Sequence, residues 1–230
     1  FAEREAAKIP DIGKDIAPRE INTAGVIGAG TMGRGIAISL ADSGLPVTIV
    51  ETGREALDAA MAEIVKLYEA MVARGRIDEA TKAERLGRIT GAVDYSALSH
   101  ADLVIEVAFE DMDVKKQIFG ALEKVAKPGA VLATNTSYMD IDAIAATTSR
   151  PEDIIGLHYF APANVMRMLE VVRPANCAPD AIATGMALAK RTGKVGVLAG
   201  VCHGFVANRS RLPLVREATF LVEEGASPAQ

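Results

Sequence analysis

The sequence of 230 residues is poor in several residue types, and each shortage excludes a class of protein. It has no tryptophan, few other aromatic residues and only two cysteines, Cys177 and Cys202. These cysteines have no metal-ligand spacing, and a chain of this size needs no disulfide framework, so we expect reduced thiols in an intracellular protein. The three histidines are too scattered for a zinc site, and no metal is expected.

Long apolar runs and an excess of positive charge are missing as well. The longest apolar stretches, such as 102–109 and 195–201, fall well short of the roughly 20 residues that span a bilayer, which excludes a membrane segment. The net charge is -5, and no stripe of Lys and Arg could neutralise a phosphate backbone, so we expect no nucleic acid partner. The charged opening FAEREAAKIP does not resemble a secretory signal, and we expect a cut or processed start at Phe1.

The remaining composition is that of an ordinary globular protein, with half of the residues apolar and 24% charged. Helical and strand periods alternate along the chain, which predicts an α/β fold of the Rossmann type, a doubly wound and mostly parallel sheet. We expect strands over 24–30, 46–51, 102–109, 130–137, 154–160, 168–174 and 194–200. We expect helices over 31–44, 112–126, 178–193 and 205–225, and an inserted helical pair over 54–88 that turns at Gly75.

Three parts of the chain follow from this reading. Residues 1–20 contain Pro10, Gly13 and Pro18 among mixed charges and are predicted to be a linker or tail. Residues 21–202 are predicted to form the dinucleotide-binding domain. Residues 203–230 are predicted to be the first helix of a further, all-helical domain.

The segment GAGTMG matches the motif G-x-G-x-x-G, and it lies between an expected strand and an expected helix. The first glycine permits a sharp turn, the second lets backbone amides approach a pyrophosphate, and the third allows close packing of helix on strand. The start of the helix then faces the diphosphate charge. The expected cofactor-binding residues of this turn are Gly28, Gly30, Thr31, Met32 and Gly33.

An acid at the end of the next strand selects the cofactor. Glu51 lies 21 residues beyond Gly30, where a carboxylate accepts hydrogen bonds from the adenosine ribose and repels a 2′-phosphate. We therefore expect NAD rather than NADP. Two alternatives stay open from the residues alone: the glycines only make a tight turn, or the same motif holds the pyrophosphate of FAD.

Dinucleotide binding does not name a reaction, so the expected catalytic groups must be sought elsewhere. Removal of a hydride from an alcohol carbon needs a base for the hydroxyl proton, and a histidine tuned by a carboxylate is a common solution. His158 ends one expected strand, Glu170 lies in the neighbouring one, and Ser137 lies at a carboxyl end of the sheet. The alternatives are a packed core histidine, a surface carboxylate and a helix-capping serine.

The motifs IGAGTMGRGIA, DLVIEVAFEDMDVKKQIF, ATNTSYMDI, IIGLHYFAPANVMRMLEVV and GFVANR occur in the order found in the 3-hydroxyacyl-CoA dehydrogenase family. This resemblance runs from about Ile21 to the last residue. It implies that His158 is the general base, Glu170 its partner, Ser137 a contact for the substrate 3-oxygen and Asn208 a polar active-site group. Two further residues match positions near the cofactor in that family: Glu110 and Lys115.

The resemblance implies NAD-dependent oxidation of 3-hydroxyacyl-CoA to 3-ketoacyl-CoA in fatty acid beta-oxidation, with an acyl-CoA thioester as the substrate partner. The form HYFAPANVMRMLEVV looks most like the multifunctional enzymes in which a hydratase domain comes first, and FAEREAAKIP resembles the link between the domains. Such a protein is expected in the cytoplasm, or in the peroxisome of a eukaryote. A dehydrogenase of a free hydroxy acid and a non-catalytic dinucleotide-binding protein are the alternatives.

The sequence departs from the family in two ways. Ala161 stands where Asn or Ser is usual, which removes a side-chain hydrogen bond near the nicotinamide, and Tyr159 replaces the more common Phe. The family also continues into a helical domain that completes the acyl-CoA cleft, so we expect a fragment that binds NAD but turns over acyl-CoA slowly. We expect its last helix to be disordered, folded back or packed on another copy, because it carries apolar residues with little to cover them: Phe205, Leu212, Val215 and Val222.

Overall fold

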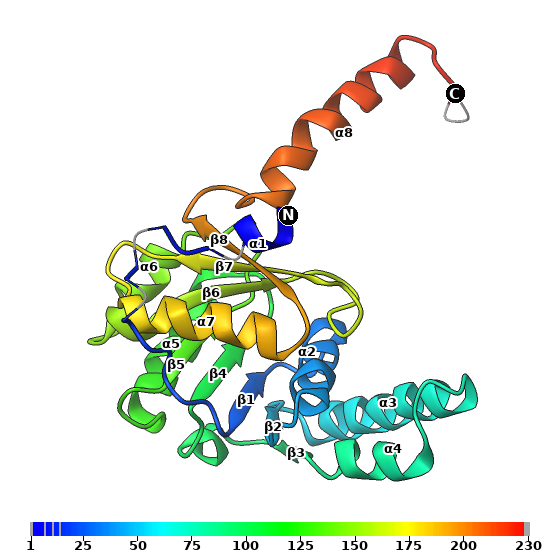
Figure 1. The fold of residues 1–230 in the computed structure, drawn as a ribbon, viewed down its shortest axis with the longest axis vertical. Helices are drawn as coiled ribbons and strands as arrows, with labels where there is room; N and C mark the ends of the chain where they lie inside the picture. The colour runs from blue at the N-terminus through cyan, green and yellow to red at the C-terminus, as the bar shows by residue number, and fades with distance from the viewer. Residues whose placement is uncertain (1, 7, 11, 14, 228–230) are drawn as a thin grey trace.

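The computed structural model describes residues 2–6, 8–10, 12–13 and 15–227, and it contains an eight-stranded sheet with helices on both faces (Figure 1). The order across the sheet is β3-β2-β1-β4-β5-β6-β7-β8. The first six strands in sequence run parallel, whereas β7 and β8 run the opposite way because β7 pairs antiparallel with β6. The predicted doubly wound, mostly parallel sheet is therefore confirmed.

The strands are short and apolar. They are β1 (Ala24–Ile27), β2 (Val47–Val50), β3 (Ile89–Ala92), β4 (Leu103–Glu106), β5 (Val131–Thr134), β6 (Ile154–Tyr159), β7 (Met168–Arg173) and β8 (Val195–Gly200). Every residue of β1, β4 and β5 is buried, as expected for central parallel strands that are covered on both faces.

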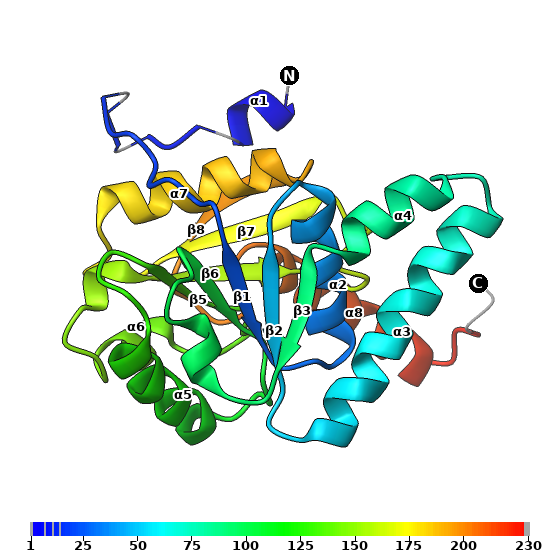
Figure 2. The same cartoon turned by 90° about the horizontal axis from the view of Figure 1, so that it is seen from below.

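Two layers of helices bury the sheet, and Figure 2 shows them from below. One core cluster joins the sheet to α2 (Thr31–Asp42), α3 (Arg54–Ala73) and α7 (Pro179–Arg191). The other joins the opposite face to α5 (Met112–Val125) and α6 (Ile141–Ala145). The winding changes direction between β1 and β4, and in open sheets of this kind ligands bind beyond the carboxyl ends of the strands at that point.

The inserted helical pair is confirmed, but the strand that follows it was not predicted. The pair consists of α3 and α4 (Glu79–Leu86), and Gly75 in the connection has a φ of 65°. The chain then forms β3 at the edge of the sheet, where only Ile89 is buried. Its sequence, ITGA, is short, and it lacks the apolar alternation from which a strand is recognised.

Part of the expected linker is held against the domain. Residues 2–6 form the short helix α1, and Arg19 lies against α7. The Arg19 guanidinium donates to Asp180 (Nε to Oδ2, 2.9 Å) and to Asp153, and these carboxylates raise the pKa of Arg19 against the opposing effect of burial. The backbone N–H of Arg19 donates to the Thr184 hydroxyl at 2.8 Å. The domain therefore includes the end of this segment.

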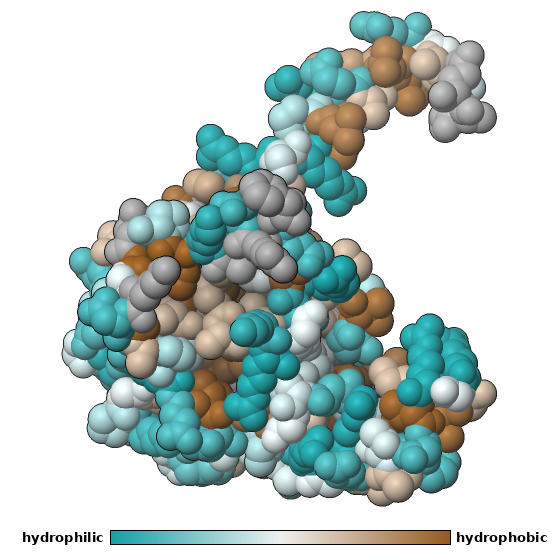
Figure 3. Space-filling model, viewed as in Figure 1, coloured by the Kyte–Doolittle hydropathy of each residue, from teal (hydrophilic) through white to brown (hydrophobic). Residues whose placement is uncertain are grey.

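The last helix, α8 (Ala207–Glu223), is regular and continues through Pro213. It extends away from the sheet, and apolar residues lie along it among charged ones (Figures 1 and 3). The expectations of a disordered or folded-back helix are therefore wrong, because its first turn is anchored by N–H groups that donate to Glu170. Packing on another copy stays a prediction. No helix in the described part of the chain is long and apolar enough to cross a bilayer.

Candidate functional site

The glycine turn joins β1 to α2 and has the geometry of a phosphate cradle. Gly28 has a φ of 98°, and a Cβ there would lie 2.8 Å from the carbonyl oxygen of Val107. A Cβ on Gly33 would lie 1.8 Å from the carbonyl oxygen of Gly28, so both positions require glycine. A Cβ on Gly30 would point into open space, and Gly30 begins α2 without any side-chain cap. The first amides of α2 are thus free to face a diphosphate.

Glu51 ties the end of β2 to this turn. Its carboxylate accepts hydrogen bonds from the backbone N–H groups of Ala29 and Thr52, both at 3.0 Å. Each carboxylate oxygen can accept a further bond, which leaves Glu51 able to bind ribose hydroxyls. A cavity of about 550 Å³ opens beside it, and its lining includes Gly28, Gly30, Glu51, Tyr95, Phe109 and Ile118. The residues present therefore fit the adenosine half of a dinucleotide.

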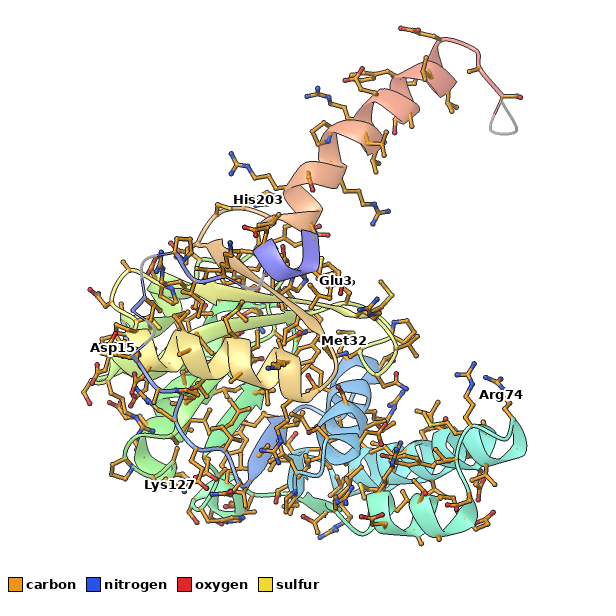
Figure 4. The ribbon with its side chains drawn as sticks, in the orientation of Figure 1. Glu3, Asp15, Met32, Arg74, Lys127 and His203 are labelled. Atoms are coloured by element: carbon orange, nitrogen blue, oxygen red, sulfur yellow. The ribbon has the colours of Figure 1, made fainter. Side chains whose placement is uncertain are left out.

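A second cavity of about 280 Å³ continues the first one across Val107 and Ala108, which line both. The rest of its lining comes from α2, the loop before α5, α5 itself and the loop after β5: Met32, Glu110, Lys115, Asn135, Ser137 and Tyr138. Figure 4 labels Met32 near the start of α2 and His203 where the chain turns into α8. The two cavities together give room for an extended ligand that crosses the switch point of the sheet.

Lys115 is buried between two carboxylates rather than exposed to a ligand. Its ammonium donates to Glu106 at 2.9 and 3.0 Å, and it lies 3.3 Å from Glu110. These contacts use the three donors of a lysine. Lys115 therefore holds Glu110 in place, and its predicted contact with the cofactor stays a prediction.

Glu110 connects this ion pair to the loop that carries Ser137. It accepts hydrogen bonds from the Thr136 hydroxyl and from the backbone N–H of Ser137, the latter at 2.9 Å. Burial raises the pKa of Glu110, but the bonds from Thr136 and Ser137 and the charge of Lys115 together lower it below its ordinary value. An ionised carboxylate thus lies at the edge of the smaller cavity.

His158 and Glu170 lie opposite each other on neighbouring strands, as expected. They are paired in the register of β6 and β7, and His158 Nδ1 lies 2.6 Å from Glu170 Oε2. The other ring nitrogen, Nε2, lies 3.2 Å from the Ser137 hydroxyl. Because a carboxylate can only accept, Nδ1 carries the proton and Nε2 faces Ser137 as an acceptor. The arrangement can take up a proton at Nε2 and stabilise the resulting charge.

Aromatic rings enclose this histidine. The ring of Phe160 lies 4.5 Å from that of His158 and the ring of Phe205 lies 5.6 Å away, measured between centroids. Asn208 lies in the first turn of α8, next to Ala207, whose N–H donates to Glu170. Its side chain makes no hydrogen bond within the residues that the structure describes, so its active-site role stays a prediction.

The sequence reading missed Glu106. This residue ends β4, is fully buried, and also accepts hydrogen bonds from the Thr134 hydroxyl and the Ala108 N–H, both at 2.7 Å. The signal was present in the sequence, since a single acid inside the apolar run DLVIEVAF must find a partner, and Lys115 follows nine residues later. In the described part of the chain, no cluster of His, Cys, Asp or Glu could hold a metal ion.

Fold and site together define a Rossmann-type dinucleotide-binding domain with a histidine–carboxylate pair beside the cofactor cavity. Residues 23–202 match the family described as 3-hydroxyacyl-CoA dehydrogenase, NAD binding domain. The chain belongs to this family. The predicted family and the predicted cofactor, NAD, are confirmed.

Curated relatives and solved structures agree with this assignment. The chain is 44% identical to a peroxisomal bifunctional enzyme of Danio rerio, over all of its length and 32% of that protein. It is 39% identical to a fatty acid oxidation complex subunit alpha of Psychrobacter cryohalolentis, over 90% of the chain and 29% of that protein. A solved (S)-3-hydroxybutyryl-CoA dehydrogenase of Ralstonia eutropha is 36% identical with a TM-score of 0.89, over 91% of this chain and 75% of that one. The chain thus spans about a third of the length of these curated relatives.

Proposed function

We propose that the chain is the NAD-binding part of an enzyme that oxidises 3-hydroxyacyl-CoA to 3-ketoacyl-CoA. The observation that carries this proposal is the row Ser137, His158 and Glu170, which begins at the smaller cavity and ends inside the sheet. Bound NAD+ would supply the hydride acceptor. His158 Nε2 accepts the proton of the substrate hydroxyl, Ser137 hydrogen-bonds the same oxygen, and Glu170 stabilises the charged imidazole.

The names of the relatives support a substrate class and a setting. Peroxisomal bifunctional enzymes and a fatty acid oxidation complex subunit are similar to this chain over most of its length. We therefore assign the chain to a multifunctional beta-oxidation enzyme in the peroxisome or the cytoplasm, with an acyl-CoA thioester as substrate and a hydratase part as partner. A free hydroxy acid and a non-catalytic role have less support, since the histidine pair is complete.

The test is formation of NADH by the whole protein with 3-hydroxyacyl-CoA substrates of several chain lengths. The variant His158→Ala should lose roughly 10²- to 10⁴-fold in kcat, because it removes the proton acceptor, while the Kd for NAD+ stays unchanged. Residues 1–230 alone should bind NAD+ and turn over slowly. An unchanged rate in the variant, or equal rates with the free hydroxy acids, would overturn the proposal.

A further inference from the structure

Glu170 bonds His158 and also two backbone N–H groups, and the proposed reaction does not explain these two. One oxygen, Oε2, bonds His158, while the other, Oε1, accepts from the backbone N–H groups of Val206 at 2.9 Å and Ala207 at 2.8 Å. Glu170 is fully buried, so all three bonds form away from solvent. A carboxylate held at both oxygens cannot rotate, and its direction fixes the ring of His158.

The two amides come from the start of α8, which lies more than 30 residues further along the chain. The first N–H groups of a helix have no partner within it, and Val206 at the N-cap provides no side-chain cap. Glu170 therefore caps α8 from the sheet. The same carboxylate sets both the origin of this helix and the orientation of the histidine.

The turn that delivers these amides has an unusual backbone. Phe205 has a φ of 47°, and it is the only residue other than glycine with a positive φ in the described part of the chain. Gly204 before it has a φ of 73°. A left-handed conformation at a bulky residue is strained and persists only where the surroundings enforce it. Here the Phe205 ring is 1% exposed and packs near His158.

We propose that Phe205 is a positioning residue, whose left-handed backbone places the amides of Val206 and Ala207 on Glu170 and so holds His158 with its proton on Nδ1. The expected effect on turnover rests on the proposed function. The expected effect on the orientation and proton of His158 does not. Through these hydrogen bonds, the direction of α8 is coupled to the orientation of the His158 ring. Nothing in it requires Phe205 to touch the substrate.

The test compares two variants that both lose the ring but differ in backbone preference. Glycine adopts a positive φ without strain, whereas valine resists it. Phe205→Gly should therefore keep the Glu170 contacts, and Phe205→Val should lose them. Phe119→Val is the matched control for lost packing. It removes a fully buried phenylalanine in the middle of α5 that belongs to the same core cluster as Phe205.

The first measurement is the ¹⁵N and ¹H NMR spectrum of the histidines, of which there are three. His158 should show a downfield Nδ1 proton in the unaltered protein, in Phe205→Gly and in Phe119→Val, and should lose it in Phe205→Val. Gly204→Ala, which also strains the turn, should behave like Phe205→Val. Identical spectra for Phe205→Gly and Phe205→Val, or loss of the signal in Phe119→Val, would overturn the proposal.

The second measurement is turnover. In Phe205→Val, kcat should fall about tenfold or more, because Glu170 loses the two amide hydrogen bonds that hold it, while the Kd for NAD+ stays the same. Phe205→Gly should keep a higher kcat than Phe205→Val, because both lose the ring but only glycine keeps the turn unstrained. If the unaltered protein shows the Nδ1 proton but no turnover, the proposed function fails and the positioning role stands. A uniform loss of both kcat and NAD+ binding in all variants would contradict the positioning role.

Discussion

The Glu170 carboxylate accepts hydrogen bonds from three donors, so a single substitution there should affect both turnover and stability. Glu170→Gln keeps the shape, but a carboxamide has only one oxygen, so its NH2 group must face either His158 or the two amides of α8. We expect kcat to fall roughly a hundredfold or more and unfolding free energy to fall by about 1–3 kcal/mol. Steady-state kinetics and urea unfolding measure the two effects.

Glu152→Gln is the control, since this acid is exposed and lies outside the site. It should leave both quantities unchanged. A Glu170→Gln variant with native turnover would show that the carboxylate neither orients the histidine nor stabilises its charge.

Tyr159 shows the opposite situation, a buried polar atom without a partner. Its hydroxyl is buried and makes no hydrogen bond within the described residues, and burial raises the pKa of the phenol. Tyr159→Phe removes the desolvated hydroxyl and keeps the ring, so we expect an unfolding free energy equal to the original or up to about 1 kcal/mol higher. Thermal unfolding measures it. A loss of more than 1 kcal/mol would mean that the hydroxyl is bonded.

At the scale of the elements, the buried pair of Lys115 and Glu106 fastens α5 to the end of β4. Lys115→Met leaves Glu106 buried without its cation, and breaking such a pair costs about 3–5 kcal/mol. We expect the free energy of unfolding, measured in urea, to fall by that amount. We also expect weaker NAD+ binding by calorimetry, because Glu110 and the Ala108 loop lose their support.

The control lies on the same helix. Lys124 is exposed near the end of α5, and Lys124→Met should change stability by less than about 0.5 kcal/mol. If both lysine variants were equally stable, the buried pair would have no structural role.

The elements also show what the sequence could predict. The alternation of apolar strands and amphipathic helices predicts the doubly wound, mostly parallel sheet. The glycine motif predicts the turn, and the placement of His158 and Glu170 in consecutive strands predicts their pairing. β3 was missed because ITGA has only one buried residue. The bonds from Glu170 to Val206 and Ala207 were not predictable, because a backbone N–H has no signature in a sequence and 36 residues separate the partners.

At the scale of the whole molecule, Asp102 joins distant segments and makes stability depend on pH. Its carboxylate accepts from the N–H groups of Asn22 and Thr23 and pairs with Lys127. Burial opposes ionisation, but these bonds lower the pKa of Asp102. A lowered pKa means that the contribution is complete above the unfolded value near pH 4 and is lost as the pH falls through the folded value.

Asp102→Asn should therefore cost about 1–2 kcal/mol in urea unfolding at pH 7 and much less near pH 2. Asp58→Asn, an exposed acid on α3, should show a small and nearly constant difference. An effect of Asp102→Asn that is the same at both pH values would contradict the role given to its charge.

The central claim is that substrate hydride leaves from a carbon held between His158 and the dinucleotide cavity. The direct measurement uses 3-hydroxyacyl-CoA carrying deuterium at C3, with the whole protein, and follows deuterium into the reduced cofactor by mass spectrometry. We predict one deuterium in each NADH formed, and a rate that falls roughly 10²- to 10⁴-fold in His158→Ala. NADH without deuterium, or no reduction of NAD+ by any 3-hydroxyacyl-CoA, would contradict the account.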